Sequence, residues 1–125
     1  MNQREKGNIG ESDVCNYLET LNYKIIKRNY TIKGGETDII AVKNNIIAFV
    51  EVKTRKKNAL VSGFEAITAS KKLRIIKCAQ HYFIHNECDQ QPRFDIAIVE
   101  TANGKTTNIE YVENAYDMSD TNIIF

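Results

Sequence analysis

The sequence lacks the features of secreted and membrane proteins. Its three cysteines, Cys15, Cys78 and Cys88, are odd in number and show no CxxC spacing, so a reducing compartment is expected rather than a disulfide framework. No apolar run is long enough to span a membrane, and no membrane association is expected. Residues 1–5 are too polar to begin a secretory signal. These absences predict a cytoplasmic protein.

The common phosphate-binding and nucleophile motifs are also absent. No Walker loop, GxGxxG or GxSxG pattern occurs, and neither an internal repeat nor a linker is visible. The single proline, Pro92, is expected in a polar loop. With 125 residues, 42% hydrophobic and 26% charged, the chain is expected to fold as one domain, 1–125, with an ordinary core.

Charge is distributed unevenly along the chain, although the net charge is only +1. From Lys43 to Lys77 there are nine basic residues and two acidic ones, whereas from Glu100 to the end there are five acidic residues and one basic one. A basic region beside a smaller acidic cluster suits a polyanionic substrate. The alternative is that the basic loops are simply solvated.

Hydrophobic periodicity and turn residues predict seven elements. Helices are expected over residues 9–21 and from residue 65 or 70 to residue 86, with Ser70 as a candidate cap for the second. Strands are expected over 23–30, 36–43, 46–55, 93–100 and 107–112. This order, αβββαββ, predicts an α/β fold with a mixed central sheet flanked by helices.

The turn Asn44-Asn45 fixes how two of these strands pair. A two-residue hairpin places Lys43 opposite Ile46, and the same register places Asp38 opposite Glu51 and, further on, Glu36 opposite Lys53. Side chains alternate along strands, so these acids and the lysine are predicted to share one face of the sheet. A bulge would shift this register.

Two carboxylates facing each other across a hairpin repel unless a cation lies between them or one is protonated. Mg²⁺ prefers oxygen ligands from one or two carboxylates. A lysine such as Lys53 beside that ion would orient water or stabilise developing negative charge. Asp38, Glu51 and Lys53 therefore predict a site for phosphodiester hydrolysis, the alternative being charges on a solvated sheet face.

Two further acidic residues have two interpretations each. Glu11, near the start of the first predicted helix, either complements the helix dipole or supplies an additional metal ligand. Asp95 interrupts an apolar strand, and pairing with Arg93 or a nearby lysine is expected more than a catalytic role.

Basic residues near these acids are candidate contacts to nucleic acid. Phosphate oxygens are bound by lysine and arginine side chains, although a solvated helix end or loop is the simpler alternative. The candidates are Arg55, Lys56, Lys57, Lys71 and Lys72.

An ordered set of short segments resembles the YraN-like bacterial family, which is uncharacterised and belongs to the PD-(D/E)xK restriction-endonuclease-like superfamily. The resemblance covers nearly the whole chain, and its segments are Gly7-Asn8-Ile9-Gly10-Glu11, Arg28-Asn29, Gly35-Glu36-Thr37-Asp38-Ile39-Ile40-Ala41, Phe49-Val50-Glu51-Val52-Lys53-Thr54-Arg55, Gly63, Lys71-Lys72, Arg93-Phe94-Asp95 and Asn114-Ala115-Tyr116.

The superfamily pattern implies roles for residues at matching positions. Asp38, Glu51 and the backbone carbonyl of Val52 would be metal ligands, and Lys53 would be the catalytic lysine. Glu11 matches an acidic residue of the first helix in archaeal Holliday-junction resolvases, which are similar proteins, and would contribute a further ligand.

The resemblance and the residues together predict a Mg²⁺- or Mn²⁺-dependent endonuclease acting on DNA, with branched or junction DNA as a candidate substrate. A symmetric junction would be matched by a two-fold homodimer. The alternative is a non-catalytic nucleic-acid-binding or adaptor protein that keeps the nuclease fold.

Overall fold

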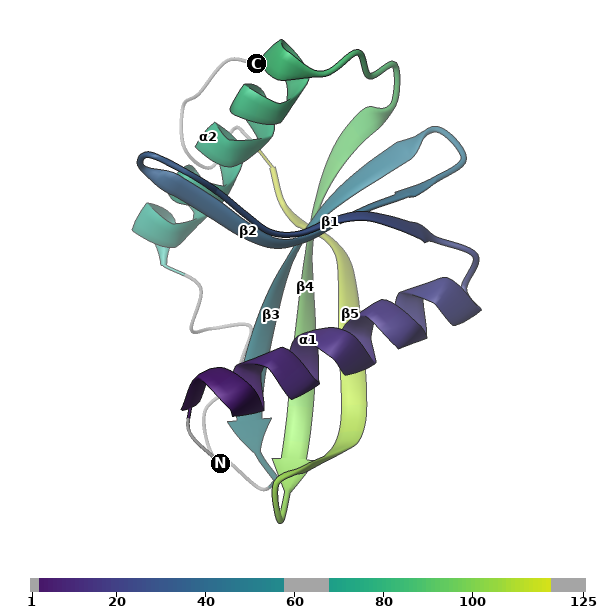
Figure 1. Cartoon of the computed structure of the whole chain (residues 1–125), viewed down its shortest axis with the longest axis vertical. Coiled ribbons are helices and arrows are strands. Elements are labelled where there is room, and N and C mark those ends of the chain that lie inside the picture. Colours follow the sequence, from purple (N-terminus) through teal and green to yellow (C-terminus); the bar gives the residue numbers. More distant parts are fainter. Residues whose placement is uncertain (1–2, 58–67, 118–125) are drawn as a thin grey trace.

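The protein, seen in a computed structural model, has the seven elements in the predicted order (Figure 1). The structure describes residues 3–57 and 68–117. The helices are α1 (Gln3–Thr20) and α2 (Ala69–His85), and the strands are β1 (Lys24–Ile32), β2 (Gly35–Lys43), β3 (Ile46–Lys56), β4 (Gln91–Ala102) and β5 (Lys105–Tyr116).

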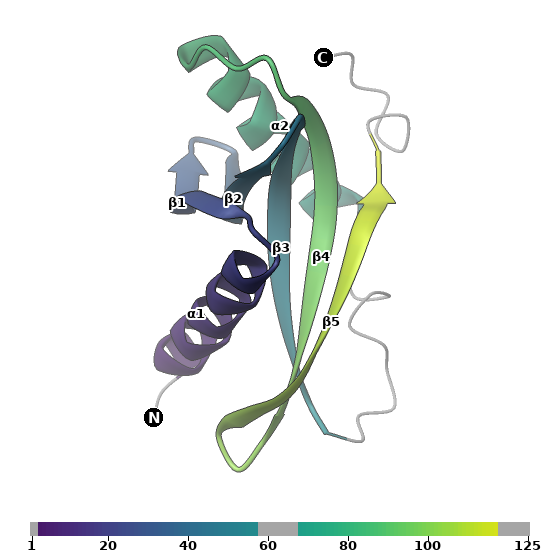
Figure 2. The same ribbon diagram turned by 90° about the vertical axis from the view of Figure 1, so that its right-hand side faces the viewer.

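The five strands form one mixed sheet in the order β1-β2-β3-β4-β5. Neighbouring strands are antiparallel except β3 and β4, which are parallel and pair from Ile46–Gln91 to Lys56–Thr101. Parallel neighbours require a crossover, and α2 lies within it. This αβββαββ arrangement is that of a restriction-endonuclease-like fold, as predicted. Figure 2 shows β3, β4 and β5 side by side, with α1 to one side of them.

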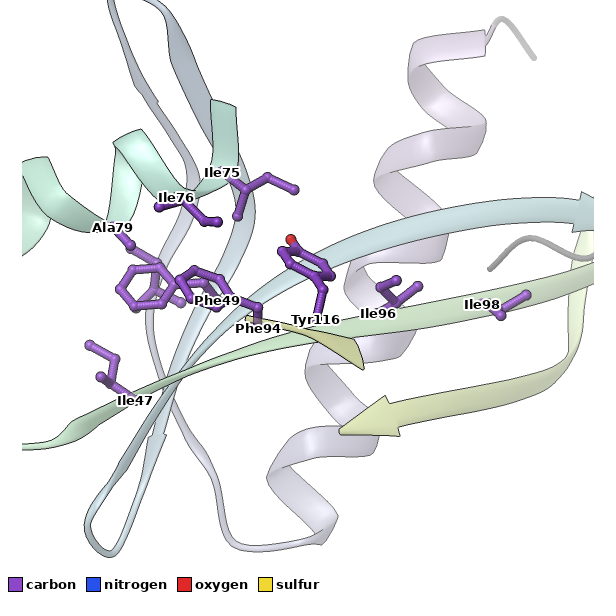
Figure 3. Close-up of a cluster of buried hydrophobic side chains, with 10 residues drawn as sticks. Ile47, Phe49, Ile75, Ile76, Ala79, Phe94, Ile96, Ile98 and Tyr116 are labelled. Atoms are coloured by element: carbon purple, nitrogen blue, oxygen red, sulfur yellow. The ribbon is translucent and has the colours of Figure 1, made fainter. Parts of the chain in front are cut away.

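Side chains that alternate along the strands pack into two separate hydrophobic cores, one on each face of the sheet. One lies beneath α2 and includes Phe49, Ile76 and Phe94, which are labelled in Figure 3. The other lies beneath α1 and includes Leu18 and Val50. Phe49 and Val50 are adjacent in β3 and both are fully buried, so this strand is covered on its two faces. Its polar residues must therefore have partners or a function.

Helix α2 approaches β2 very closely at Gly35. A Cβ atom on Gly35 would lie 2.6 Å from the Arg74 carbonyl oxygen and 3.3 Å from the Cys78 amide nitrogen. Only glycine allows this approach without moving the helix backbone. The contact holds α2, at Arg74 and Cys78, beside the strand that carries Asp38.

Several predicted boundaries differ from the observed ones. Thr68, rather than Ser70, caps α2: its hydroxyl accepts a hydrogen bond from the Lys71 amide at 3.1 Å. Strand β5 extends to Tyr116, beyond the predicted end at residue 112. Strand β4 begins at Gln91, so Pro92, expected in a loop, lies within the strand and pairs with Ile47. The segments at Gly63, residue 65 and 123–125 lie outside the described residues. Neither helix of the described part is long and apolar enough to cross a membrane.

Candidate functional site

The hairpin register is confirmed up to the last pair before the two acids. Strands β2 and β3 pair from Lys43–Ile46 to Ile39–Val50, and Asn44 in the turn has a left-handed φ of 52°. The ladder ends at Ile39–Val50, so the predicted facing of Glu36 and Lys53 is not part of it. Instead, Glu36 pairs with Thr31 of β1 and lies 4.0 Å from Arg74.

Asp38 and Glu51 lie together where the two strands separate. The Val52 amide donates a 2.7 Å hydrogen bond to Oδ2 of Asp38, which fixes this carboxylate against β3. Glu51 is buried, with only 2% of its surface exposed. Burial and the neighbouring Asp38 charge raise the pKa of Glu51 from 4.5 to about 7. The acid pair predicted from the sequence is thus close enough for mutual repulsion.

Two lysines converge on the same oxygen of Glu51. Lys71 Nζ lies 2.6 Å from Glu51 Oε1, and Lys53 Nζ lies 3.9 Å from it. Burial and the adjacent Lys71 lower the pKa of Lys53. The ion pair with Glu51 outweighs burial and raises the pKa of Lys71. Lys53 therefore lies in the acidic site as predicted, and Lys71, expected to contact phosphate, contacts a carboxylate.

Glu11 lies on the Asp38 side of the site. Arg28 contacts its carboxylate at 3.6 Å, and Asn29, with its amide nitrogen turned toward Glu11, donates to Oε1 at 3.2 Å. Asn29 has a left-handed φ of 52°, a conformation that asparagine adopts more readily than most residues. Burial and the charge of Asp38 raise the pKa of Glu11. Glu11 thus extends the acidic site, positioned by β1.

The remaining basic candidates divide into two groups. Arg55 pairs with Glu100 at 3.6 Å, and Lys72 Nζ lies 5.4 Å from the centre of the Tyr116 ring. Lys56 and Lys57 are exposed and line a cleft of about 450 Å³ between the start of α1, the end of β3 and the β4–β5 turn. These two lysines keep their charges available to solvent.

Tyr116 is a residue of the site that the sequence did not reveal. It is 5% exposed, and its hydroxyl has no hydrogen-bond partner among the described residues. Burial and the charge of Glu51 raise its pKa. In Figure 3 the hydroxyl points toward the side of the sheet that α2 covers. The predicted strand ended at residue 112. In the structure β5 continues to Tyr116, which pairs with Phe94 of β4.

Asp95 is structural, as expected from its neighbour Arg93. The carboxylate is completely buried and accepts two hydrogen bonds from Arg93 Nε, at 2.9 and 3.1 Å, and one from the guanidinium nitrogen Nη2 at 2.8 Å. The Tyr111 hydroxyl and the Asn114 amide also donate to it. Asp95 therefore joins β4 to the last part of β5, which carries Tyr116.

The donor set suits a hard divalent cation. Among the described residues no three His, Cys, Asp or Glu side chains group closely enough to form a metal cluster, so the candidate centre rests on the pair Asp38 and Glu51. Mg²⁺ is commonly held by one or two carboxylates, with water completing its ligands. The Tyr116 hydroxyl near Glu51, which has no hydrogen-bond partner within residues 3–57 and 68–117, is consistent with a site that accepts a further polar group.

The fold and the acid–lysine group define a restriction-endonuclease-like α/β protein. The profile of the uncharacterised protein family UPF0102 matches residues 10–99, so the chain belongs to that family, the YraN-like family that its motifs indicate. The UPF0102 protein of Alkaliphilus metalliredigens is 41% identical over 88% of this chain and 96% of its own. Those of Dictyoglomus turgidum and Caldicellulosiruptor saccharolyticus are each 36% identical, over 93% of this chain and 100% of their own.

The raised pKa of Glu51 predicts how metal-free stability depends on pH. Between its ordinary value of 4.5 and its folded value of about 7, the folded protein holds a proton that the unfolded chain has released, so stability falls as pH rises through this window. The expected loss is on the order of 3 kcal/mol. Urea unfolding in EDTA, compared with Glu51→Gln, measures it.

The glutamine variant cannot titrate at this position, so the difference in stability between it and the wild type should change with pH. Glu36→Gln, which alters a half-exposed carboxylate, should keep the wild-type pH dependence. A wild-type-minus-Glu51→Gln difference that stays constant from pH 4.5 to pH 8 would contradict the burial and repulsion described for Glu51.

Proposed function

We propose that this protein is a metal-dependent endonuclease that hydrolyses phosphodiester bonds in DNA, with Mg²⁺ or Mn²⁺ as its cofactor. The observation that carries the proposal is the buried Glu51 beside Asp38, with the Lys53 ammonium 3.9 Å from the Glu51 carboxylate. A buried carboxylate beside a second, half-buried carboxylate is unfavourable without cations, and the two nearby lysines offset this repulsion only in part, since the pKa of Glu51 stays raised. A divalent ion bound by both carboxylates would offset their mutual repulsion.

In this proposal each side chain has a defined task. Asp38 and Glu51 hold the ion, with the Val52 carbonyl as an additional ligand. Glu11, predicted as a further ligand, does not group closely with this pair and instead adds negative charge beside Asp38. The bound ion supplies Lewis-acid stabilisation of negative charge on the phosphate. Lys53 orients the attacking water and stabilises charge that develops in the transition state. The Tyr116 hydroxyl is a further donor available to water or to a phosphate oxygen.

The DNA backbone is proposed to run from the acidic site toward the cleft that Lys56 and Lys57 line. Thr54, next to Lys53 in β3, lines the same cleft. Branched or junction DNA is the favoured substrate, with a two-fold dimer matching a symmetric junction. A cytoplasmic location belongs to the same proposal and agrees with the three free thiols of Cys15, Cys78 and Cys88.

A second candidate function is nucleic-acid binding without cleavage, by an adaptor that retains the nuclease fold. The observation in its favour is the close Lys71–Glu51 ion pair, which already neutralises one carboxylate. This alternative predicts salt-sensitive DNA binding and no metal-dependent hydrolysis. It also predicts that replacing Asp38 changes neither DNA binding nor hydrolysis.

Cleavage assays separate the two functions. Purified protein is incubated with junction, flap and duplex DNA and Mn²⁺, beside Asp38→Asn, which keeps the size of the side chain and removes its charge. The nuclease proposal predicts cleavage by the wild type and none by the variant. Equal weak cleavage by both would identify a contaminating nuclease, and binding without cleavage by either would establish the adaptor.

The cleft lysines predict a measurable salt dependence. We expect Lys56→Ala/Lys57→Ala to weaken binding similarly for all DNA sequences and to reduce the slope of log K against log salt by about two, because each lysine neutralises about one phosphate. Fluorescence anisotropy across a salt series measures this slope. Lys24→Ala/Lys27→Ala removes the same charge from exposed positions of β1 and should leave the slope unchanged; equal slopes for the two double variants would contradict the assignment.

A further inference from the structure

Lys71 is the nearest cation to the acidic site, and the proposed reaction as described does not use it. Its Nζ is 2.6 Å from Glu51 Oε1, a length typical of a strong charge-assisted hydrogen bond. Lys53 approaches the same oxygen only to 3.9 Å. Glu51 is 2% exposed, so water contributes little to its neutralisation. In the metal-free protein, Lys71 is therefore the main counter-ion of Glu51.

The position of Lys71 in the fold would be unfavourable without Glu51. It lies in the first turn of α2, three residues after the N-cap Thr68, where the helix dipole disfavours positive charge. Close packing of α2 on Gly35 brings this turn to the site. The Lys71 side chain is 32% exposed, so its flexible stem can also turn outward into solvent without moving the helix.

The charge balance of the site changes when a divalent ion binds, and this change favours separation of Lys71 from Glu51. When Glu51 is ionised, it and Asp38 carry two negative charges, which Lys53 and Lys71 balance. A divalent ion adds two positive charges beside the same oxygen atoms. Repulsion then favours departure of one ammonium, and an incoming phosphate restores the balance. Lys71 is the closer of the two to the oxygen that the ion would take and its side chain is the more exposed, at 32% against 25% for Lys53, so Lys71 is the one expected to leave.

We propose that Lys71 is an exchangeable counter-ion: it neutralises Glu51 until a divalent cation binds, and its released ammonium then binds a phosphate of the DNA. This inference rests on the proposed function and adds a coupling to it, because metal and DNA would each promote binding of the other. Lys71 is thus a positioning residue for the substrate, and it blocks the site while metal is absent.

Lysine reactivity tests the exchange directly. The intact protein is treated briefly with an amine-acylating reagent, with and without Mg²⁺, and modification of each lysine is quantified by mass spectrometry. Lys71 should become several-fold more reactive when Mg²⁺ is added, because its ammonium leaves Glu51. Lys72, the adjacent residue, lies against the Tyr116 ring and should not change. In Asp38→Asn the response of Lys71 should disappear.

A parallel Mn²⁺ titration followed by water-proton relaxation separates two kinds of failure. If the wild type binds no Mn²⁺, the proposed function itself is wrong. If Mn²⁺ binds and Asp38→Asn abolishes that binding, but the reactivity of Lys71 stays constant or rises equally with that of Lys72, then the exchange is overturned and the metal site stands.

DNA affinity provides a second readout. With Ca²⁺ as the divalent ion, binding of duplex DNA by the wild type and by Lys77→Met, a control at an exposed position of α2, should strengthen about tenfold, the effect of roughly one charge-assisted phosphate contact. In Lys71→Met the effect of Ca²⁺ should be largely lost. An undiminished effect of Ca²⁺ in Lys71→Met would overturn the coupling, and because the variant is compared with itself, altered stability does not obscure the result.

Discussion

Replacing Lys53 by alanine should lower the rate of DNA cleavage by a factor on the order of 10² to 10³, the typical effect of removing one group that stabilises transition-state charge. The physical reason is the position of this ammonium 3.9 Å from Glu51 in a buried site, where charge interactions are less screened than in water. Single-turnover cleavage of junction DNA at saturating Mn²⁺ measures the change.

Metal binding should survive this substitution, since Lys53 is a cation and not a ligand. Mn²⁺ affinity measured by calorimetry should therefore be at least as high in Lys53→Ala as in the wild type. Lys24→Ala, at an exposed position of β1, is the matched control and should cleave normally. Full activity in Lys53→Ala would contradict the proposed role of Lys53 in catalysis.

Replacing Asp95 by asparagine should reduce the free energy of unfolding by about 3 to 5 kcal/mol, the usual cost of removing one partner of a buried ion pair. Asp95 is completely buried and accepts hydrogen bonds from Arg93, Tyr111 and the Asn114 amide. The variant leaves the guanidinium of Arg93, whose side chain is 16% exposed, without its principal counter-ion. Urea or guanidinium denaturation gives the difference.

The same arginine offers an internal control. Arg93 also contacts Glu113 at 3.8 Å, but that side chain is 62% exposed, and an exposed ion pair contributes at most about 1 kcal/mol. Glu113→Gln should therefore be nearly neutral. A similar small effect for both variants would mean that Asp95 does not anchor β5 to β4 as described.

Local sequence signals were sufficient to predict the order of the helices and strands and the pairing of Asp38 with Glu51 at one end of the hairpin. The two-residue turn at Asn44-Asn45 determines the register of β2 and β3, because its length leaves one pairing that keeps Ile40 and Phe49 on the same face. That register brought Asp38 and Glu51 to the same end of the hairpin. The predicted apolar stripe of α2, including Ile75 and Ile76, is also the buried one.

The remaining features depend on tertiary packing that no local pattern encodes. The ladder ends after Ile39–Val50 because Asp38 takes the Val52 amide as its partner. Lys71 reaches Glu51 from α2, which packs closely against Gly35 of β2 and is distant in sequence from both strands of the hairpin. From the sequence, a lysine in a first helical turn after a basic loop is equally compatible with solvent, phosphate or carboxylate.

The central claim is that Asp38 and Glu51 together hold a divalent cation. Anomalous diffraction from crystals grown with Mn²⁺ tests it most directly. The account predicts an anomalous peak in contact with both carboxylates, with Lys71 turned away from Glu51. Crystals saturated with Mn²⁺ that show no peak there, and Lys71 still paired with Glu51, would contradict it.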